Sequence, residues 1–454
     1  MNLKYMKYFL CVFALFINSS AFADIAIKNW VHASGAKVFL VETTAIPMVD
    51  VQIDWGAGGI HVPADKVGLA SLTAVMIDKG AIKNSKILSE AEISDQFADH
   101  GAMLSIAAGS DRISLKLRSL SDKKYLTPVI DLVVAILKAP AFDAGILSRE
   151  KDLMMSSIKE ADLKPEIVLG KEFDRQIYGN HPLSRSATVA SVKKINIADV
   201  RDFYRKRFYA ANSKITIVGN LSRDDANAVV DQLVNVLPKE NSESFAVIDS
   251  VKLLDAKPLA DRLIKIDHPS QQAHISMGLP MISRRDPDYF PLLLGNYILG
   301  GGGFVSRLMK EVREKRGLAY SVYSYMAPGK DVGPFVAGMQ TKKDQSDLAV
   351  QVMHETIGNF VANGPSDEEM RAAKENLTNG FPLRIDSNKK ILDNVSSIAW
   401  NDLPLDTLDT WTKQLNAVTK EQVVTAYKKH LDMNKVVTVI VGRSEEHTSE
   451  LQSH

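Results

Sequence analysis

The chain of 454 residues carries 55 basic and 54 acidic side chains, so its net charge is only +1. Because no basic block stands out, the composition argues against a nucleic-acid-binding protein and against a protein held on an anionic membrane. The single cysteine, Cys11, lies in a segment that we expect to be removed, which excludes disulfides and thiol catalysis from the mature protein. At this length, a chain that is 45% hydrophobic has enough apolar material for two or more domains.

The first 23 residues are typical of a secretory signal peptide. Lys4 and Lys7 precede an apolar stretch at 8–17, and the small residues of Ala21-Phe22-Ala23 predict cleavage after Ala23. The apolar stretch is too short to span a bilayer, and no later run reaches 18 apolar residues. We therefore expect an exported, periplasmic protein that is not inserted in a membrane after cleavage; secretion from the cell is the less favoured alternative.

The last twelve residues, 443–454, read RSEEHTSELQSH and match the translation of a common short-read sequencing adapter. We interpret them as an assembly artefact and leave them out of the fold. A charged tail, or a metal-binding pair formed by His447 and His454, is the alternative.

The first half of the chain, 24–236, predicts strands that alternate with helices. In the strand at 49–55, apolar residues alternate with Asp50, Gln52 and Asp54, which is the period of a half-buried strand. At 89–100, Ser89 followed by Glu92 has the spacing of a capping box. The other expected elements are strands at 37–41, 103–107, 112–118 and 214–218 and helices at 67–77, 125–137 and 143–159.

Residues 237–262 are expected to form a linker, because they open with a polar run and contain Pro258. In the second half, 263–442, a helix is predicted to begin at Asp286-Pro287, with proline at the first helical position. Ser366 and Glu369 have the spacing of another capping box. The remaining expectations are strands at 263–267, 274–278 and 333–341 and a helix at 345–362.

The two halves repeat one another. Residues 200–219 align with 423–442 without a gap, at a constant offset of 223 residues. This period is far longer than that of solenoid repeats. We therefore predict an α+β fold made of two homologous domains, each a mostly antiparallel sheet with helices packed on it.

A glycine-rich stretch stands out in the second half. Gly300, Gly301, Gly302 and Gly303 end an apolar run and leave a loop nearly free of side chains, which another backbone can approach closely. A short amphipathic helix is predicted next, with Val305, Leu308, Met309 and Val312 on one face, followed by a strand at 318–325. Arg313 and Tyr320 can then point into the same space, although an arginine and a tyrosine alone are usually a surface pair.

This stretch, LGGGGFVSRLMKEVREKRGLAYS, resembles the C-terminal half of the pitrilysin/insulinase-type zinc peptidases. The resemblance implies that Arg313 and Tyr320 contact the substrate and help to polarise the scissile carbonyl. It also implies that the substrate lies along Gly300–Gly303 and Phe304, or that this loop lies at a subunit contact. The paired halves of the family face each other around a substrate chamber, so we expect a clam-shell half-chamber here.

The zinc motif of the family is absent from this chain. Active members carry H-x-x-E-H on a helix of the first half, with a later glutamate as the third protein ligand. The sequence context survives as GLASLTAVMIDKG at 68–80, and the resemblance assigns the motif positions to Ser71, Ala74 and Val75 and the later glutamate to Ser157. None of these side chains can replace the original ligands or the general base. We therefore expect no bound metal and no peptidase activity in this chain alone.

Some family members divide their active site between two chains, and this sequence resembles the subunit that carries the Arg/Tyr pair. The expected function is that of an accessory subunit in a heteromeric zinc metallopeptidase that acts on extended peptides. Zinc would be bound by an H-x-x-E-H sister subunit. A catalytically inactive peptide-binding or scaffold protein is the alternative. The third and least favoured interpretation is an enzyme with a new metal site near Glu150, Glu160 and a displaced histidine.

Overall fold

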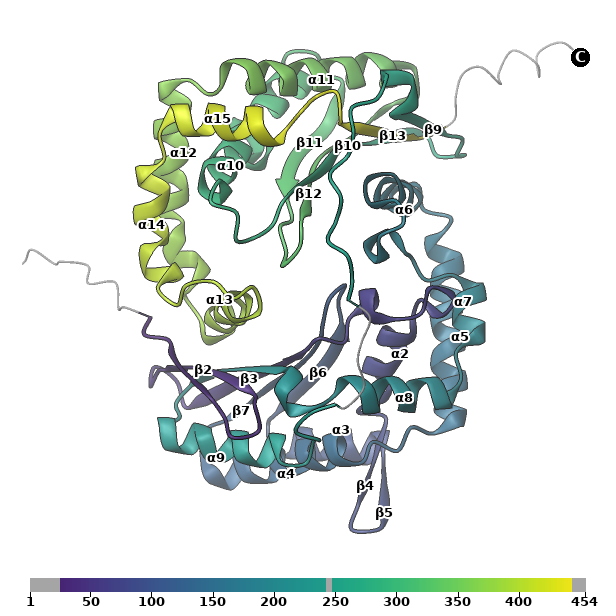
Figure 1. The fold of residues 1–454 in the computed structure, drawn as a ribbon, viewed down its shortest axis with the longest axis vertical. Helices are drawn as coiled ribbons and strands as arrows, with labels where there is room; N and C mark the ends of the chain where they lie inside the picture. Colours follow the sequence, from purple (N-terminus) through teal and green to yellow (C-terminus); the bar gives the residue numbers. More distant parts are fainter. Residues whose placement is uncertain (1–24, 242–246, 443–454) are drawn as a thin grey trace, which may run out of the picture.

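The computed structural model describes residues 25–241 and 247–442, which form two lobes stacked along the long axis of the molecule (Figure 1). The expected signal peptide and the expected artefact at 443–454 lie outside the described residues. Among the described residues, no helix is both long enough and apolar enough to cross a membrane.

The N-terminal lobe is built on a six-stranded sheet with the order β1-β2-β8-β3-β7-β6. β2 and β8 are parallel, while β3 runs antiparallel to both β7 and β8. β6 and β7, which correspond to the strands predicted at 103–107 and 112–118, pair with each other antiparallel. The strands are β1 Lys28–Val31, β2 Lys37–Glu42, β3 Met48–Trp55, β6 Met103–Ala108, β7 Ile113–Leu120 and β8 Ser213–Gly219.

The helices of this lobe bury one face of the sheet. Val49, Val51 and Ile53 of β3 belong to the core on that face, where α4 and α9 pack together. The helices of the first half of the chain are α2 Leu69–Met76, α3 Glu90–Asp99, α4 Lys123–Lys138, α5 Ala144–Ala161, α6 Pro165–Tyr178, α7 Val189–Lys194, α8 Ile197–Arg207 and α9 Arg223–Val234, and all of them except α6 belong to this lobe. The predicted capping box is confirmed, because the Ser89 hydroxyl accepts the Glu92 N–H while Glu92 accepts the Ser89 N–H. A hairpin that was not predicted, β4 Gly80–Lys83 and β5 Lys86–Ser89, projects from the lobe (Figure 1).

The C-terminal lobe repeats this architecture. Its sheet has the order β11-β12-β10-β13-β9, which matches β6-β7-β3-β8-β2 strand for strand. The strands are β9 Leu263–Ile266, β10 Gln272–Ile282, β11 Ala319–Met326, β12 Gly333–Lys342 and β13 Val437–Val441. The helices are α10 Tyr289–Asn296, α11 Ser346–Asn363, α12 Asp367–Asn379, α13 Asn388–Trp400, α14 Thr407–Ala417 and α15 Lys420–His430. Helices α4, α5, α6 and α8 each begin 223 residues before α11, α12, α13 and α15, so the fold confirms two homologous α+β units.

One predicted helix start was wrong. α10 begins at Tyr289, two residues after Pro287, because the Asp286 carboxylate accepts the backbone N–H of Asp288 at 2.9 Å and holds a turn there. The capping box of Ser366 and Glu369 is confirmed.

Two equivalent helices are exchanged between the lobes. α6 belongs to the first repeat but packs on β10 and β13 of the second, where Leu169, Phe173 and Ile177 join the valines of β13 in one apolar cluster. α13 belongs to the second repeat but packs on β3 and β8 of the first. Figure 1 shows each helix against the sheet of the opposite lobe. Each sheet is therefore covered on its second face by a helix from the other half.

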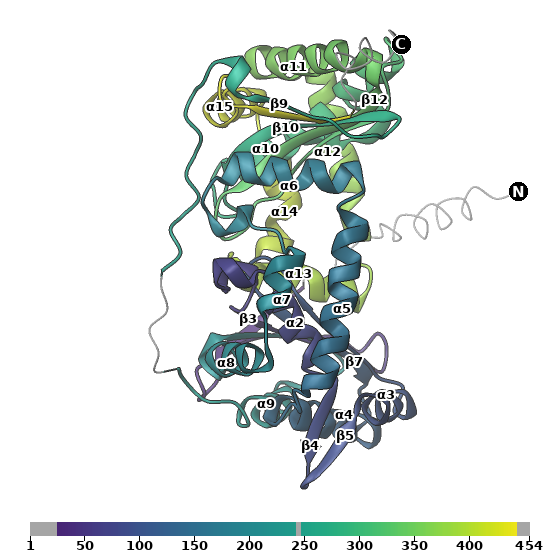
Figure 2. The ribbon, with the colours of Figure 1, turned by 90° about the vertical axis from the view of Figure 1, so that its right-hand side faces the viewer.

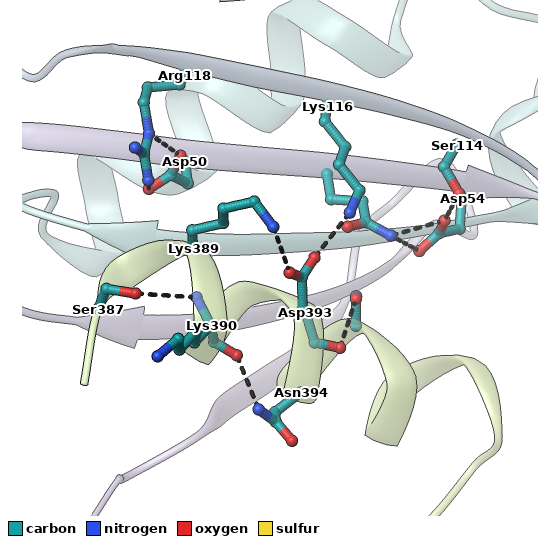
Figure 3. A network of polar contacts seen from close by, with 12 residues as sticks. Asp50, Asp54, Ser114, Lys116, Arg118, Ser387, Lys389, Lys390, Asp393 and Asn394 are labelled. Carbon is teal, nitrogen blue, oxygen red and sulfur yellow. Dashed lines mark hydrogen bonds and ion pairs between the residues drawn. The ribbon is translucent and has the colours of Figure 1, made fainter. Parts of the chain in front are cut away.

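This exchange corrects the prediction for β3. Its polar residues were expected on the exposed face of a half-buried strand, yet Asp50, Gln52 and Asp54 are at most 4% exposed because α13 covers that face. The buried carboxylates are satisfied locally: Arg118 donates to both oxygens of Asp50 at 2.7 and 3.0 Å (Figure 3). Asp54 accepts from the Gln52 amide at 2.9 Å and from the hydroxyl of Ser114. Burial raises the pKa of Asp54, while its neighbours oppose that shift.

Candidate functional site

The glycine loop is shaped by the close approach of β11. α10 continues as a π-helical turn over Tyr297–Gly301, and a Cβ on Gly300 would lie 2.5 Å from both the backbone nitrogen and the hydroxyl of Ser324. Ser324 is fixed in turn by Asn296, since the Ser324 hydroxyl donates to the side-chain oxygen Oδ1 of Asn296 at 2.8 Å. A Cβ on Gly301 would lie 2.8 Å from the Asn296 amide nitrogen. Gly300 and Gly301 are thus required locally by close packing.

The segment after the loop differs in part from the predicted amphipathic helix. Leu308, Met309 and Val312 are buried as expected, but Val305 is 77% exposed because it ends a 3-10 turn. Met309–Glu314 forms a second π-helical segment, which carries Arg313. π-Helical turns are rare and are frequent at functional sites.

Arg313 and Tyr320 are brought together as predicted. The guanidinium carbon of Arg313 lies 4.9 Å from the centroid of the Tyr320 ring and 5.1 Å from that of Phe304. The arginine therefore contacts two aromatic rings, both of which are largely exposed.

A β-bulge in β11 turns the side chain of Tyr320 toward solvent. Ala319 pairs with Thr341 and Val322 with Met339, so three steps along β11 oppose two along β12. The alternation of buried and exposed residues breaks at this point, and Tyr320 becomes 83% exposed. Bulges of this kind re-aim side chains and are common beside active sites.

Two further aromatic residues on β11 were missed by the sequence analysis. The rings of Tyr323 and Tyr325 stack with their centroids 6.1 Å apart, and the Tyr323 hydroxyl lies 2.7 Å from where a Cβ of Gly338 would be. The tyrosine ring thus lies over the glycine of β12. Because β11 is an edge strand, these tyrosines stand beside backbone groups that pair with no further strand, although the Ser324 carbonyl among them accepts from the Asn296 side chain at 3.3 Å. The tyrosines that recur in YSVYSY were the signal in the sequence.

The positions of the lost zinc motif form part of ordinary packing. Ala74 is buried in the core of the N-terminal lobe, and Ser71 and Val75 are half-buried on the same helix, α2. Ser157 is exposed on α5, which packs against α2. These four side chains supply neither an imidazole nor a carboxylate, so they do not fit a catalytic zinc.

The carboxylates considered for a new metal site take part in surface ion pairs. Glu150 accepts from Arg149 at 2.7 Å, and Glu160 accepts from Lys164 at 2.9 Å. Within the described ranges, one set of possible metal ligands comes together, and it lies elsewhere: Asp286, Asp288 and His430. These residues connect α10 to the end of α15, where Asp288 accepts from His430 at 2.8 Å and from Lys429 at 2.7 Å.

A cavity of about 830 Å³ lies between the lobes and is lined by residues from both. Burial lowers the pKa of His61 to about 4; Arg207 and Lys330 add to the lowering, and Asp111 opposes it. On the α6 side of the cavity, burial raises the pKa of Asp174 to about 6.

The sequence is similar to family models and to proteins of the M16 peptidase family. Residues 37–190 match the family model described as insulinase, peptidase family M16, and residues 194–377 match the one described as the peptidase M16 inactive domain. A Helicobacter pylori protein named a non-peptidase homolog, YmxG, is 24% identical over 441 residues, with 96% of this chain and 99% of that protein covered. An uncharacterized zinc protease YmxG of Bacillus subtilis is 24% identical over 403 residues, covering 87% and 94%.

Solved structures resemble the whole of the described fold. A peptidase M16 inactive domain from Pseudomonas fluorescens is 33% identical in sequence, with a TM-score of 0.85 and coverage of 92% of this chain and 98% of that one. A protease from Helicobacter pylori has a TM-score of 0.81 at 14% identity, with coverage of 92% and 99%. The periplasmic protease PqqL of Escherichia coli has a TM-score of 0.77 at 16% identity, and the match covers 92% of this chain and 45% of PqqL.

Proposed function

Because this chain belongs to the insulinase family of peptidases, M16, we propose that it is an accessory subunit of a heteromeric zinc metallopeptidase. In this proposal a sister chain with H-x-x-E-H binds the zinc, and this chain completes the peptide-binding and oxyanion-stabilising part of the active site. The proposed location is the periplasm, on the basis of the signal peptide expected at 1–23.

The observation that carries the proposal is the contrast between the two lobes. α2 carries no imidazole or carboxylate that could bind or use zinc, whereas the half-buried Arg313 and the exposed Tyr320 remain in cation–π contact next to the glycine loop. A protein that had lost all contact with catalysis would have no need to hold these two side chains in one place.

The chemistry of the pair suits the developing negative charge of a tetrahedral intermediate. The guanidinium of Arg313 and the hydroxyl of Tyr320 are both donors, and donors placed in advance around an oxyanion stabilise the transition state. Contact of the Arg313 side chain with Phe304 and Tyr320 reduces the side-chain freedom that would be lost when substrate arrives.

The edge strand β11 supplies a way to hold an extended peptide. Its free backbone groups can pair with a substrate strand, and Tyr323 and Tyr325 can contact alternate side chains of that strand. The proposed substrates are therefore unfolded or extended peptides.

The alternative function is a catalytically inactive peptide-binding or scaffold protein. The name of the Helicobacter relative, a non-peptidase homolog, favours it. In that case the edge strand and the tyrosines would act in binding alone.

The test is peptide cleavage with zinc quantification, on this chain alone and mixed with an H-x-x-E-H sister chain from the same organism. We expect neither zinc nor activity alone and strong activity in the mixture. Arg313→Ala should reduce kcat by about 100-fold, as removal of an oxyanion donor does, and Tyr320→Phe should act in the same direction. Arg316→Ala is the matched control, because Arg316 is an exposed arginine of the same segment that pairs with Glu311 at 2.9 Å.

Two results would overturn the proposal. If both substitutions left the activity of the mixture unchanged, the pair would have no role in catalysis. If the mixture were no more active than the sister chain alone, the alternative of a binding protein would stand.

A further inference from the structure

The Arg313 guanidinium and the Tyr320 hydroxyl are not oriented by hydrogen bonds of their own. Within residues 25–241 and 247–442, neither group has a hydrogen-bond or ion-pair partner, and Arg313 contacts the rings of Phe304 and Tyr320. Phe304 belongs to the glycine loop, whereas Tyr320 belongs to β11. The orientation of the guanidinium therefore depends on how the loop lies relative to the strand.

One buried polar pair joins the loop to the strand. The Ser324 hydroxyl donates to Oδ1 of Asn296 at 2.8 Å, and the Asn296 amide nitrogen donates to the Ser324 carbonyl at 3.3 Å. Asn296 is 8% exposed and Ser324 is 2% exposed, within a lobe whose apolar core includes the nearby Leu299 and Val322. A buried hydrogen-bonded pair adds little net stability compared with an apolar pair of the same shape, but it is satisfied in one alignment only. The pair is therefore better suited to fixing a register than to adding stability.

Asn296 and Ser324 lie where the loop leaves its helix and where β11 continues after its bulge. Asn296 is the last residue of α10, and the π-helical turn follows it directly. Ser324 comes after the bulge that exposes Tyr320. The turn lies against both partners, because a Cβ on Gly300 would be 2.5 Å from the Ser324 nitrogen and one on Gly301 would be 2.8 Å from the Asn296 amide nitrogen. A shift of the loop along β11 would therefore separate the pair.

The start of β11 is held by a different contact. The Thr341 hydroxyl of β12 donates to the Leu318 carbonyl at 2.6 Å, and the Leu318 N–H donates to the Val312 carbonyl at 3.0 Å. These bonds fix the strand and the segment of Arg313 before the bulge, and they are independent of the buried pair. Loss of the buried pair should therefore release the loop side of the site while the strand stays in its sheet.

From this geometry we propose that Asn296 and Ser324 are positioning residues. Their pair fixes the glycine loop, and with it Phe304, relative to the strand that carries Tyr320, and it thereby orients the Arg313 guanidinium toward the peptide. Both residues are buried and act through the loop rather than on the substrate. The inference rests on the proposed function for its effect on cleavage, but the placement of the loop can be measured in this chain alone.

The first measurement follows the loop in the chain alone. Residues 24–454 contain no cysteine, so Val305→Cys at the exposed loop tip and Lys342→Cys at the exposed end of β12 can carry spin labels. Double electron–electron resonance should give one narrow distance distribution in the parent chain and a broader, displaced one in Asn296→Leu. Asn388→Leu is the matched control and should keep the parent distribution, because Asn388 is another buried asparagine, on the helix α13 that packs against the N-terminal sheet.

The second measurement separates positioning from stability in the mixture with a sister chain. Asn296→Leu and Ser324→Ala should each lower Tm, because each leaves a buried polar partner unpaired, whereas the double variant should regain most of this loss. All three should lower kcat by about 10- to 100-fold and change KM by less than about twofold, since misplaced donors weaken the transition state more than substrate binding. If the pair served stability alone, kcat of the double variant would recover together with Tm.

Three results would overturn the inference: an unchanged label distribution in Asn296→Leu, an equally altered distribution in Asn388→Leu, or recovery of kcat in the double variant. The outcome is separable from that of the proposed function. A broadened distribution without stimulated cleavage in any mixture supports the positioning of the loop and overturns the proposed function. Stimulated cleavage with an unchanged distribution supports the proposed function and overturns the inference.

Discussion

Single residues set the distance between the glycine loop and β11. Gly300 has the least space of the loop glycines. Two atoms of Ser324 and one of Leu308 lie within 2.8 Å of the position that a Cβ on Gly300 would take. Two of these atoms cannot move independently, since Ser324 is tied to Asn296.

Gly300→Ala should therefore push the loop away from β11. We expect a loss of about 1–3 kcal/mol of stability, as for an overpacked core, together with weaker Arg313-dependent activity in the mixture. Gly170→Ala is the control, because Gly170 is in α6 with nothing within 4 Å of its Cβ position. That variant should be stabilised by about 0.5–1 kcal/mol. Urea unfolding of both variants checks the difference, and equal effects of the two would contradict the steric argument.

The raised pKa of Asp174 predicts how the stability of the protein depends on pH. The pKa of this carboxyl rises to about 6 in the folded chain, compared with about 3.9 for an ordinary aspartate, so between these values the folded state holds a proton that the unfolded state has released. The carboxyl therefore lowers stability as the pH rises from about 4 to about 6. The difference in Tm between Asp174→Asn and the original chain should therefore increase in favour of the variant as the pH rises from about 4 to about 6. Above about pH 6 this difference should stay constant. A difference that does not change with pH would show that the carboxyl titrates normally.

The sequence predicted that Arg313 and Tyr320 lie close together, because both belong to one short motif that spans a helix end and a strand start. It did not predict the Lys330–Trp400 contact, because a hairpin turn and the end of α13 meet only through the tertiary fold. Nor did it predict the exposure of Val305, since helical periodicity continued through a turn that is not α-helical.

At the scale of elements, the two exchanged helices make different kinds of interface. α6 meets the C-terminal sheet through an apolar cluster around Phe173 and Val439. α13 meets the N-terminal sheet partly through charges: Asp393 accepts from Lys116 of β7 at 2.7 Å and from Lys389 at 2.9 Å (Figure 3). The alternation of apolar and polar residues in β3 correctly predicted which residues share a face of that strand. No local pattern could reveal that a helix from the other repeat covers the polar face.

The two interfaces should respond differently to substitution and salt. Phe173→Ala should cost about 3–5 kcal/mol, with little dependence on salt, because it removes a large buried ring. Asp393→Asn should cost about 1 kcal/mol or less, since its ion pair is part-exposed, and the loss should shrink at high salt. Thermal unfolding at low and high salt measures both, and a large, salt-independent cost for Asp393→Asn would contradict this division.

At the scale of the whole molecule, the lobes are joined in two ways. One is the covalent connection, whose described part at 247–258 runs along the outside of the molecule (Figure 2). The other is the exchange of α6 and α13, each of which stays covalently attached to its own half.

Cutting the covalent connection should therefore leave the molecule intact. A protease site inserted between the exposed residues Lys252 and Leu253 should be cleaved, and both fragments should still elute together at the size of the uncut chain. Size-exclusion chromatography of the cleaved protein is the measurement. In the cleaved Phe173→Ala variant, the fragments should separate more readily. If the fragments of the cleaved original protein separated spontaneously, the exchanged helices would contribute little to holding the lobes together.

The exchange also has a consequence for how the chain reaches its fold. The face of the N-terminal sheet that α13 covers cannot be completed until nearly all of the sequence is available, because α13 begins at residue 388. Contacts between such distant parts of a chain close slowly, so folding should be slow for a protein of this size. Until then, a partly formed N-terminal half carries uncovered polar and apolar groups that chaperones can recognise, and heating the finished protein should unfold both repeats in one calorimetric transition.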